Sequence, residues 1–307
     1  MLMAQITDFH VTPAGRLAGA VDTRTAFTAL VDHLARLAPR PDLLIVSGDL
    51  GEVGVEEEYA FVREGLERLA IPFLAVPGNH DRRAPMRAVF GARHDDPSAV
   101  FGARHDDPSA VFGARHDDPS AVFGAQHDDP SAVFGAQHDD PSAAFGAGSI
   151  HLGVVRDMGA LRIIGLDTLV EGHSHGAIAG DQLAWLAAAL EGAADRKVLI
   201  VMHHPPFVTG IPAMDAIGLR EGRAELEALL RGRANILGIL CGHVHRAIVG
   251  SFAGHRAFIA PSASHQFALD FAGAGFRVVR EAPQIALHRV EDGALVTCLV
   301  PGPALSW

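Results

Sequence analysis

Residues 43–49 read LLIVSGD, and residues 73–81 read FLAVPGNHD. Each stretch is a short, continuous apolar run that ends near a glycine and is followed by side chains able to bind a metal ion or a proton. Similar polar clusters stand at residues 8–10 (DFH), 203–205 (HHP) and 242–245 (GHVH). Such apolar runs predict buried β-strands, and ligands gather at the carboxyl ends of strands in α/β sheets. We therefore expect these clusters to form one site.

Amphipathic stretches alternate with the apolar runs, a pattern that predicts an α/β protein. The expected strands before residue 247 are 1–7, 43–47, 73–76, 161–166, 198–202 and 236–240. The expected helices are 26–37, 56–69, 181–190 and 224–230. Short strands separated by turns follow at 257–260, 276–280, 285–290 and 295–300. This strand-rich part, residues 247–307, predicts a second, mostly antiparallel sheet.

The composition is that of a globular protein. The chain has 307 residues, of which 49% are hydrophobic and 20% charged, and this length is sufficient for one large domain with a sizeable core. Two cysteines are too few for a disulfide scaffold, so Cys241 and Cys298 are expected to be core thiols. No apolar run reaches the roughly 18 to 20 residues of a membrane span, and the first polar cluster comes too early for a signal peptide. We expect a cytoplasmic protein with no membrane partner.

Residues 90–144 hold five tandem copies of an 11-residue unit, FGARHDDPSAV, the last two with Gln in place of Arg and the last ending in Ala. These copies contain three Arg and ten Asp, and so carry seven of the eleven net negative charges. The net charge excludes a duplex nucleic-acid partner, because binding to phosphates needs a basic face. Each copy contains Gly and Pro, which exclude a long coiled coil. We interpret the repeat as a loop insertion in a single domain spanning residues 1–307; loose metal binding by its His-Asp-Asp triplets is the alternative.

The residue types in the polar clusters indicate a metal centre. They supply imidazole and carboxylate groups and no thiolate, which suits Fe, Mn or Zn and argues against a structural zinc cage. The clusters also offer more ligands than one ion can use. The sequence therefore predicts two divalent transition-metal ions as the cofactor.

The motifs D-x-H, G-D, G-N-H-D, H and G-H-x-H, in this order, resemble those of the calcineurin-like metallophosphoesterase superfamily, and the match runs from Asp8 to His245. The resemblance implies a four-layer αββα sandwich with two mixed sheets and a dinuclear metal site at the strand ends. It also implies three sets of metal ligands. These are Asp8, His10 and His245 for the first ion, Asn79, His203 and His243 for the second, and Asp49 as the bridge between them.

Phosphoester hydrolysis at such a site implies in-line attack by a metal-bound hydroxide. His80 follows a ligand in the chain but is absent from the ligand set. The resemblance therefore implies that His80 is catalytic, either stabilising charge on the phosphoryl group or protonating the leaving alkoxide. For His204 two roles stay open, support of the ligands or contact with substrate. Asp81 is expected to anchor the GNHD loop by hydrogen bonds.

Two further stretches resemble the class III cyclic-nucleotide phosphodiesterase and glycerophosphodiesterase group. They are residues 203–219 (HHPPFVTGIPAMDAIGL) and residues 261–266 (PSASHQ), and the second contains His265, expected to support the ligands or contact substrate. The predicted function is hydrolysis of a small phosphodiester, either a 3′,5′-cyclic nucleotide or a glycerophosphodiester. The alternatives are a phosphomonoesterase of the same superfamily and a metal-dependent interaction scaffold. The resemblance also allows a homo-oligomer.

Overall fold

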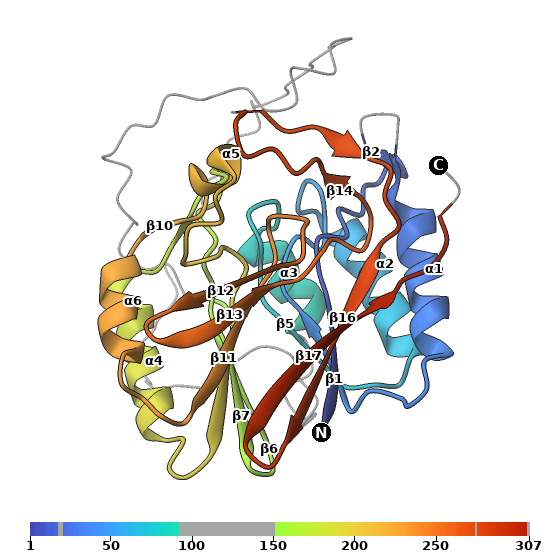
Figure 1. Cartoon of the computed structure of the whole chain (residues 1–307). Helices are drawn as coiled ribbons and strands as arrows, with labels where there is room; N and C mark the ends of the chain where they lie inside the picture. The colour runs from blue at the N-terminus through green and yellow to red at the C-terminus, as the bar shows by residue number, and fades with distance from the viewer. Residues whose placement is uncertain (18–20, 92–150, 274, 306–307) are drawn as a thin grey trace, which may run out of the picture.

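The computed structural model describes residues 1–17, 21–91, 151–273 and 275–305 (Figure 1). Apart from its first two residues, the repeat predicted at 90–144 lies outside the described residues. Two large mixed sheets and several helices make up the described part of the chain. The predicted α/β class is therefore confirmed.

The first sheet combines strands from both ends of the chain. It consists of β1 (Leu2–Ile6), β4 (Leu43–Val46), β5 (Phe73–Ala75), β16 (Gln284–Glu291) and β17 (Ala294–Pro301). Their order is β17-β16-β1-β4-β5. β1, β4 and β5 run parallel, whereas β16 pairs antiparallel with both β1 and β17.

The second sheet lies entirely in the later part of the chain. It consists of β6 (Val154–Met158), β7 (Leu161–Gly165), β9 (Lys197–Val201), β11 (Ile236–Cys241), β12 (Ile248–Phe252) and β13 (His255–Ile259). Their order is β12-β13-β11-β9-β7-β6. The four inner strands run parallel, and the two edge strands, β6 and β12, are antiparallel to their neighbours.

Short strand pairs complete the described β-structure. They are β2 (Arg16–Leu17) with β3 (Val21–Asp22), β8 (Gly176–Ala177) with β10 (Leu219–Glu221), and β14 (Gln266–Phe267) with β15 (Val278–Val279). None of them was predicted as such, and the strand expected at 276–280 is reduced to the two residues of β15. Two residues are too short a run to show a periodicity.

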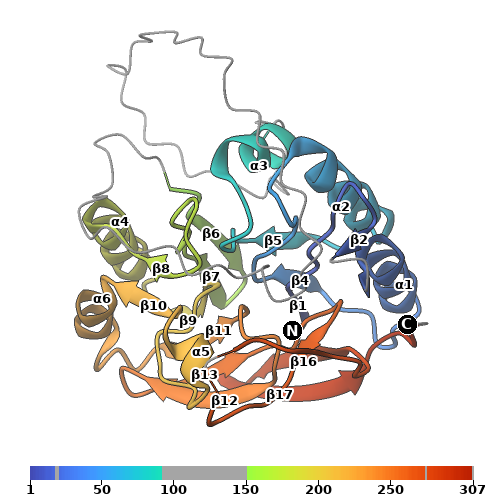
Figure 2. The same ribbon diagram turned by 90° about the horizontal axis from the view of Figure 1, so that it is seen from above.

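The four predicted helices are present within three residues of the predicted limits, as α1 (Thr23–Ala35), α2 (Glu56–Arg68), α4 (Gly180–Glu191) and α6 (Arg223–Leu230). Two further described helices, α3 (Arg83–Phe90) and α5 (Pro212–Asp215), were not predicted. α1 begins where the Asp22 carboxylate accepts the N–H of Thr25 at 2.9 Å, a standard N-cap. Figures 1 and 2 show α1 and α2 on one side of the two sheets and α4 and α6 on the other.

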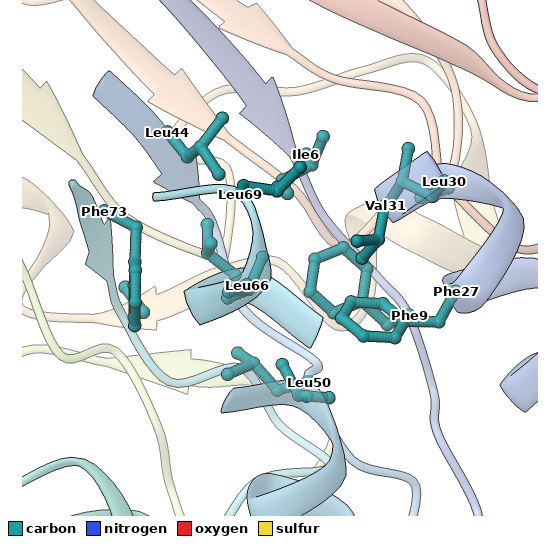
Figure 3. Close-up of a cluster of buried hydrophobic side chains, with 14 of the residues drawn as sticks. Ile6, Phe9, Phe27, Leu30, Val31, Leu44, Leu50, Leu66, Leu69 and Phe73 are labelled. Carbon is teal, nitrogen blue, oxygen red and sulfur yellow. The ribbon is translucent and has the colours of Figure 1, made fainter. Parts of the chain in front are cut away.

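The continuous apolar runs are explained by burial on both faces of each sheet. On β4, Leu44 packs in the cluster shared with α1 and α2 (Figure 3), whereas Leu43 and Ile45 pack in the cluster between the two sheets. On β9, Leu199 faces the inter-sheet cluster and Ile200 faces the cluster shared with α4 and α6. β4 and residues 198–201 of β9 are therefore apolar at every position.

Two expectations about the C-terminal part are wrong. Strands after residue 247 do not form a separate sheet: β12 and β13 extend the second sheet, and β16 and β17 extend the first. A sequence pattern of strands separated by turns predicts that neighbouring strands pair antiparallel. It does not predict which sheet edge the resulting hairpin joins. Cys298 is exposed on the edge strand β17, and only Cys241 is a buried thiol, because one face of an edge hairpin remains in solvent.

The two sheets bring distant polar loops together. The predicted clusters directly follow β1, β4 and β5 of the first sheet and β9 and β11 of the second. These five strands end at the same side of the molecule (Figure 1). Within the described residues, no helix is both long enough and apolar enough to cross a membrane.

Candidate metal centre

Five of the seven predicted metal ligands have a left-handed backbone. The φ angles are 55° for Asp8, 48° for His10, 52° for Asp49, 75° for His243 and 56° for His245. Non-glycine residues adopt this conformation rarely, at a cost of about 1–3 kcal/mol each. The chain therefore turns sharply after β1, β4 and β11, and the turn directs the polar side chain inward.

Four buried side chains form the first half of the site. The His10 Nε2 atom lies 3.1 Å from the His245 Nε2 atom and 3.6 Å from Asp49 Oδ2. His245 Nε2 lies 3.4 Å from Asp8 Oδ1. Ligand atoms of these four residues all lie within 4.8 Å of one another. This is the set that the motifs assign to the first ion together with the bridge.

The second half of the site adjoins the first at Asp49. The Asn79 Oδ1 atom lies 3.1 Å from His203 Nε2 and 2.9 Å from His243 Nδ1. His203 Nε2 also lies 3.4 Å from Asp49 Oδ2. The same carboxylate oxygen thus lies between the His10 and His203 imidazoles, and the structure brings all seven predicted ligands together.

The outer contacts of three histidines determine which ring nitrogen carries the proton. Nδ1–H of His10 donates to the Glu52 carboxylate at 2.8 Å, that of His203 to the Ser47 carbonyl at 2.7 Å, and that of His245 to the His265 carbonyl at 3.0 Å. Because these oxygens only accept, each Nδ1 carries a proton, and Nε2, which faces the centre, is the nitrogen that can bind a metal ion when the ring is neutral. Nε2 of His10 and Nε2 of His245 face each other at 3.1 Å, and a cation bound by both nitrogens would stabilise this arrangement. The donor set therefore fits divalent metal ions.

Comparison with known proteins agrees with this geometry. A family model described as calcineurin-like phosphoesterase matches residues 1–247. The chain belongs to the calcineurin-like phosphoesterase family. This confirms the resemblance identified in the sequence motifs.

The phosphoesterase is similar to several bacterial proteins along most of its length. It is 31% identical, over 300 residues, to a probable glycerophosphodiester phosphodiesterase of Arcobacter nitrofigilis, covering 97% of this chain and 92% of the relative. It is 27% identical, over 306 residues, to a 3′,5′-cyclic adenosine monophosphate phosphodiesterase of Pseudomonas aeruginosa, covering 97% and 88%. Among solved structures, a purple acid phosphatase from yellow lupin seeds has a TM-score of 0.57 at 10% identity, covering 98% of this chain and 51% of that one. This last similarity concerns the fold alone.

Opposing charges in the phosphoesterase compensate for burial. Burial alone would raise the pKa of Asp49, but the imidazoles of His203, His80 and His10 hold it well below its usual range. Burial would lower the pKa of His203, but Asp49 raises it to about 9. Burial and the neighbouring His203 lower the pKa of His243 to about 3. The site thus concentrates negative charge on Asp49 at its middle.

His80 lies beside the first half of the site, and its side chain is 26% exposed. Its backbone N–H donates to Asp49 Oδ1 at 2.9 Å, and its Nδ1–H donates to the Glu52 carbonyl at 3.0 Å. The Glu52 carboxylate lies 3.4 Å from the same ring nitrogen and also holds His10. Sequence reasoning missed Glu52, although its place three residues after Asp49 in the GDLGE run was a usable signal.

Asp81 connects two of the ligand loops. Its buried carboxylate accepts backbone N–H groups of Leu50, Gly51 and Gly78. Burial and the nearby Asp49 carboxylate raise its pKa to about 6. The loop after β4, which carries Asp49, is thereby tied to the GNHD loop after β5.

His204 lies beside the second half, with its ring centroid 4.6 Å from that of His243. Its Nε2–H donates to the Ser174 carbonyl at 3.2 Å, and its Nδ1 accepts from the Thr168 hydroxyl at 2.7 Å. Both ring nitrogens of His204 therefore pair with protein atoms. This arrangement fixes the ring, which can support the neighbouring ligand His243 by packing against it. Thr168 and Ser174 carry no motif, and sequence reasoning missed them.

The segment PSASHQ, residues 261–266, packs against the first half of the site. The hydroxyls of Ser262 and Ser264 donate to the Asp8 carbonyl at 2.8 and 3.0 Å. The buried His265 ring stacks edge-on against His245, with ring centroids 4.5 Å apart. This segment therefore holds the left-handed turn at Asp8.

Proposed function

We propose that the protein is a phosphodiesterase that uses two divalent transition-metal ions, Fe, Mn or Zn, to hydrolyse a small phosphodiester. The observation that carries this proposal is the position of Asp49 Oδ2, 3.6 Å from one imidazole of the first half and 3.4 Å from one of the second. A carboxylate shared by two complete donor sets suits a two-metal centre. The substrate class, a 3′,5′-cyclic nucleotide or a glycerophosphodiester, is supported by the names of the relatives.

Two ions bound at these donors would polarise the phosphoryl oxygens and activate a water molecule for in-line attack. The chain's own residues set the geometry of that chemistry. Asp49 lies between the two halves, and Asn79 adds a neutral oxygen that leaves the centre electrophilic. His80 keeps Nδ1–H on the Glu52 carbonyl, so when the ring is protonated at both nitrogens, Nε2–H is the group that can donate a proton to the leaving alkoxide or a hydrogen bond to the phosphoryl group.

The arrangement of helices and sheets supports a four-layer αββα sandwich, which we propose as the architecture of the chain. The apolar clusters on the two outer sides of the sheets and between them are the basis for this proposal. The cytoplasmic location and a homo-oligomeric state stay predictions.

The test is a substrate panel on purified protein reconstituted separately with Mn²⁺, Zn²⁺ or Fe²⁺. The panel contains bis(p-nitrophenyl) phosphate, p-nitrophenyl phosphate, cyclic AMP and glycerophosphoethanolamine. We expect the diesters to be cleaved with higher kcat/KM than the monoester, and one natural diester to be preferred. Faster cleavage of the monoester would establish a phosphomonoesterase, and metal binding without any hydrolysis would support an interaction scaffold.

A further inference from the structure

Gln5 is a buried polar side chain on the face of β1 that packs against the second sheet. Alternate residues of a strand share a face, and Met3, two residues earlier, belongs to the apolar cluster between the two sheets. Gln5 is only 1% exposed. A buried amide is costly unless hydrogen bonds satisfy it, so the partners of Gln5 identify what this side chain connects.

The amide of Gln5 is fully paired. Its Nε2 atom donates to the Ser47 hydroxyl and to the Cys241 carbonyl, each at 2.8 Å, and its Oε1 atom accepts Nε2–H of His288 at 2.9 Å. Because the Cys241 carbonyl only accepts, the amide nitrogen must face it, and this contact fixes the orientation of the amide.

The two residues that accept from Gln5 belong to different sheets, and each lies two residues before a predicted metal ligand. Ser47 directly follows β4 of the first sheet and precedes Asp49, the shared carboxylate. Cys241 ends β11 of the second sheet and precedes His243. One amide group therefore joins the ends of two strands that carry metal ligands.

These strand ends are packed so closely that a displacement of either one reaches the ligands. The Ser47 carbonyl accepts Nδ1–H of His203 at 2.7 Å. A methyl group added at Gly242 would come within 2.7 Å of the same carbonyl oxygen, and one added at Gly48 would overlap the His203 ring. The positions of Ser47 and Cys241 are thus transmitted directly to the metal centre.

Each half of the centre takes donors from both sheets. In the first half, His245 follows β11 of the second sheet, whereas its other donors follow strands of the first sheet. In the second half, Asn79 follows the first sheet, and His203 and His243 follow the second. The separation of the two sheets at their strand ends therefore sets the donor distances in both halves.

We propose that Gln5 is a positioning residue that fixes this separation and, with it, the spacing of the two metal ions. This inference rests on the proposed two-metal function and deepens it. Among the described residues, Gln5 hydrogen-bonds to no predicted ligand, and it acts through Ser47 and Cys241. Loss of its amide lets the strand ends shift, so both ions should bind more weakly and their separation should change.

Three variants separate the amide from general packing. Gln5→Met keeps an unbranched side chain of similar length without the amide. Ser47→Ala removes one of the two acceptors and leaves the Ser47 backbone carbonyl on His203. Ile45→Val is the matched control, because Ile45 pairs with Gln5 in the sheet and packs in the same inter-sheet cluster with no polar group.

The experiment titrates metal-free wild type and the three variants with Co²⁺, following heat release, and records electron paramagnetic resonance spectra of the Mn²⁺-loaded proteins. Two Mn²⁺ ions that share a ligand give a spin-coupled spectrum that depends on their separation. We expect two ions, wild-type affinities and the wild-type spectrum in Ile45→Val. In Gln5→Met we expect both ions to bind about tenfold more weakly, the low end of the loss for groups that orient ligands, with altered coupling. Ser47→Ala should change both readouts in the same direction by less.

The outcomes separate this inference from the proposed function. Wild-type affinities and an unchanged Mn²⁺ spectrum in folded Gln5→Met would overturn it. Equal weakening in Ile45→Val would assign the effect to packing and also overturn it. If Gln5→Met does not fold, Ser47→Ala decides, and failure of both to fold while Ile45→Val folds would make the amide purely structural and overturn the inference. If wild type itself binds fewer than two ions, it is the proposed two-metal function that fails.

Discussion

Arg83 and Asp167 form a bidentate ion pair, with Nε–Oδ2 and a terminal nitrogen–Oδ1 distances of 2.6 and 2.9 Å. This pair connects the start of α3, just after the GNHD loop, to the residues that follow β7. The same Asp167 carboxylate accepts the N–H of Leu152 at 2.8 Å. It therefore holds the chain both before and after residues 92–150. Sequence reasoning missed this anchor because neither residue belongs to a metal motif.

Deleting residues 101–144 should leave a folded enzyme that binds two metal ions. The described anchors at Arg83 and Leu152 lie outside the deleted range, and lengthening a flexible loop costs only about 0.6 kcal/mol per doubling. We expect kcat/KM for bis(p-nitrophenyl) phosphate to stay within about tenfold of the parent, a change of at most about 1.4 kcal/mol in the barrier. The measurement compares both proteins at low and moderate salt. Loss of folding or of metal binding would show that the repeat is a structural element.

Asp167→Asn should lower the free energy of unfolding by about 3 kcal/mol, the low end of the range for breaking a buried ion pair. The Asp167 side chain is fully buried, and that of Arg83 is 17% exposed. Asp157→Asn is the matched control, since Asp157 also pairs with an arginine, Arg162, but is 36% exposed. Asp157→Asn should lower the free energy of unfolding by at most about 1 kcal/mol. Urea denaturation measures both, and equal losses would contradict the anchoring role of Asp167.

Asp49→Asn should weaken the binding of both metal ions and reduce kcat/KM by more than about 100-fold, beyond the loss typical of residues that only orient ligands. The amide has the size of the carboxylate but lacks the negative charge that lies between His10 and His203. Metal content after dialysis and steady-state kinetics are the measurements. Asp32→Asn, at an exposed carboxylate paired with Arg68, is the control. Two retained ions with near-normal turnover would refute the shared-ligand interpretation.

His80→Ala should retain both metal ions and lose roughly 100-fold in turnover, the usual contribution of a positioned acid. If the ring protonates the leaving group, the loss should be smaller for p-nitrophenol esters than for alkyl esters. An equal loss for all leaving groups would instead assign the ring to the phosphoryl oxygens. His33→Ala on α1 serves as the control for removing an imidazole. Metal loss in His80→Ala would mean that His80 belongs to the ligand set.

The protein should become less stable on acidification through His288, which is buried on β16 and neutral. Burial lowers its pKa to about 3 in the folded chain, whereas an unfolded histidine has a pKa of about 6.5. Below pH 6.5 the unfolded chain therefore binds a proton that the folded chain does not, and stability falls by up to about 1.4 kcal/mol per pH unit.

His288→Gln, which cannot titrate, tests this prediction. Thr297 and Gln5 pair with the two ring nitrogens of His288 at 2.8 and 2.9 Å, and glutamine can keep one of these contacts. The stability difference between wild type and variant, from urea curves at pH 8, 6 and 5, should shift in favour of the variant as the pH falls. A difference that does not vary with pH would contradict the role of His288.

Local pattern was sufficient for most of the helices and inner strands. The runs around Leu44 and Ile200 are apolar at every position because both faces are buried, and the charged start of α2 marks its first turn. The same reasoning failed at the edges. The alternating pattern of β17, which contains Cys298, is equally compatible with several sheet edges. The position of β17 is set by its pairing with β16, which in turn pairs with β1.

The sequence by itself determined the chemistry of the donors and their order along the chain, because strand ends and ligand types are local properties. Only the tertiary structure decided how the donors are shared. His10 and His245 are 235 residues apart in sequence, yet their Nε2 atoms lie 3.1 Å apart because β1 and β11 belong to two sheets packed face to face. It likewise separated His204, whose ring nitrogens both pair with protein atoms, from His265, for which only Nδ1 has a ring hydrogen bond among the described residues. Such long-range hydrogen bonds depend on the packing of the whole chain, and no motif records them.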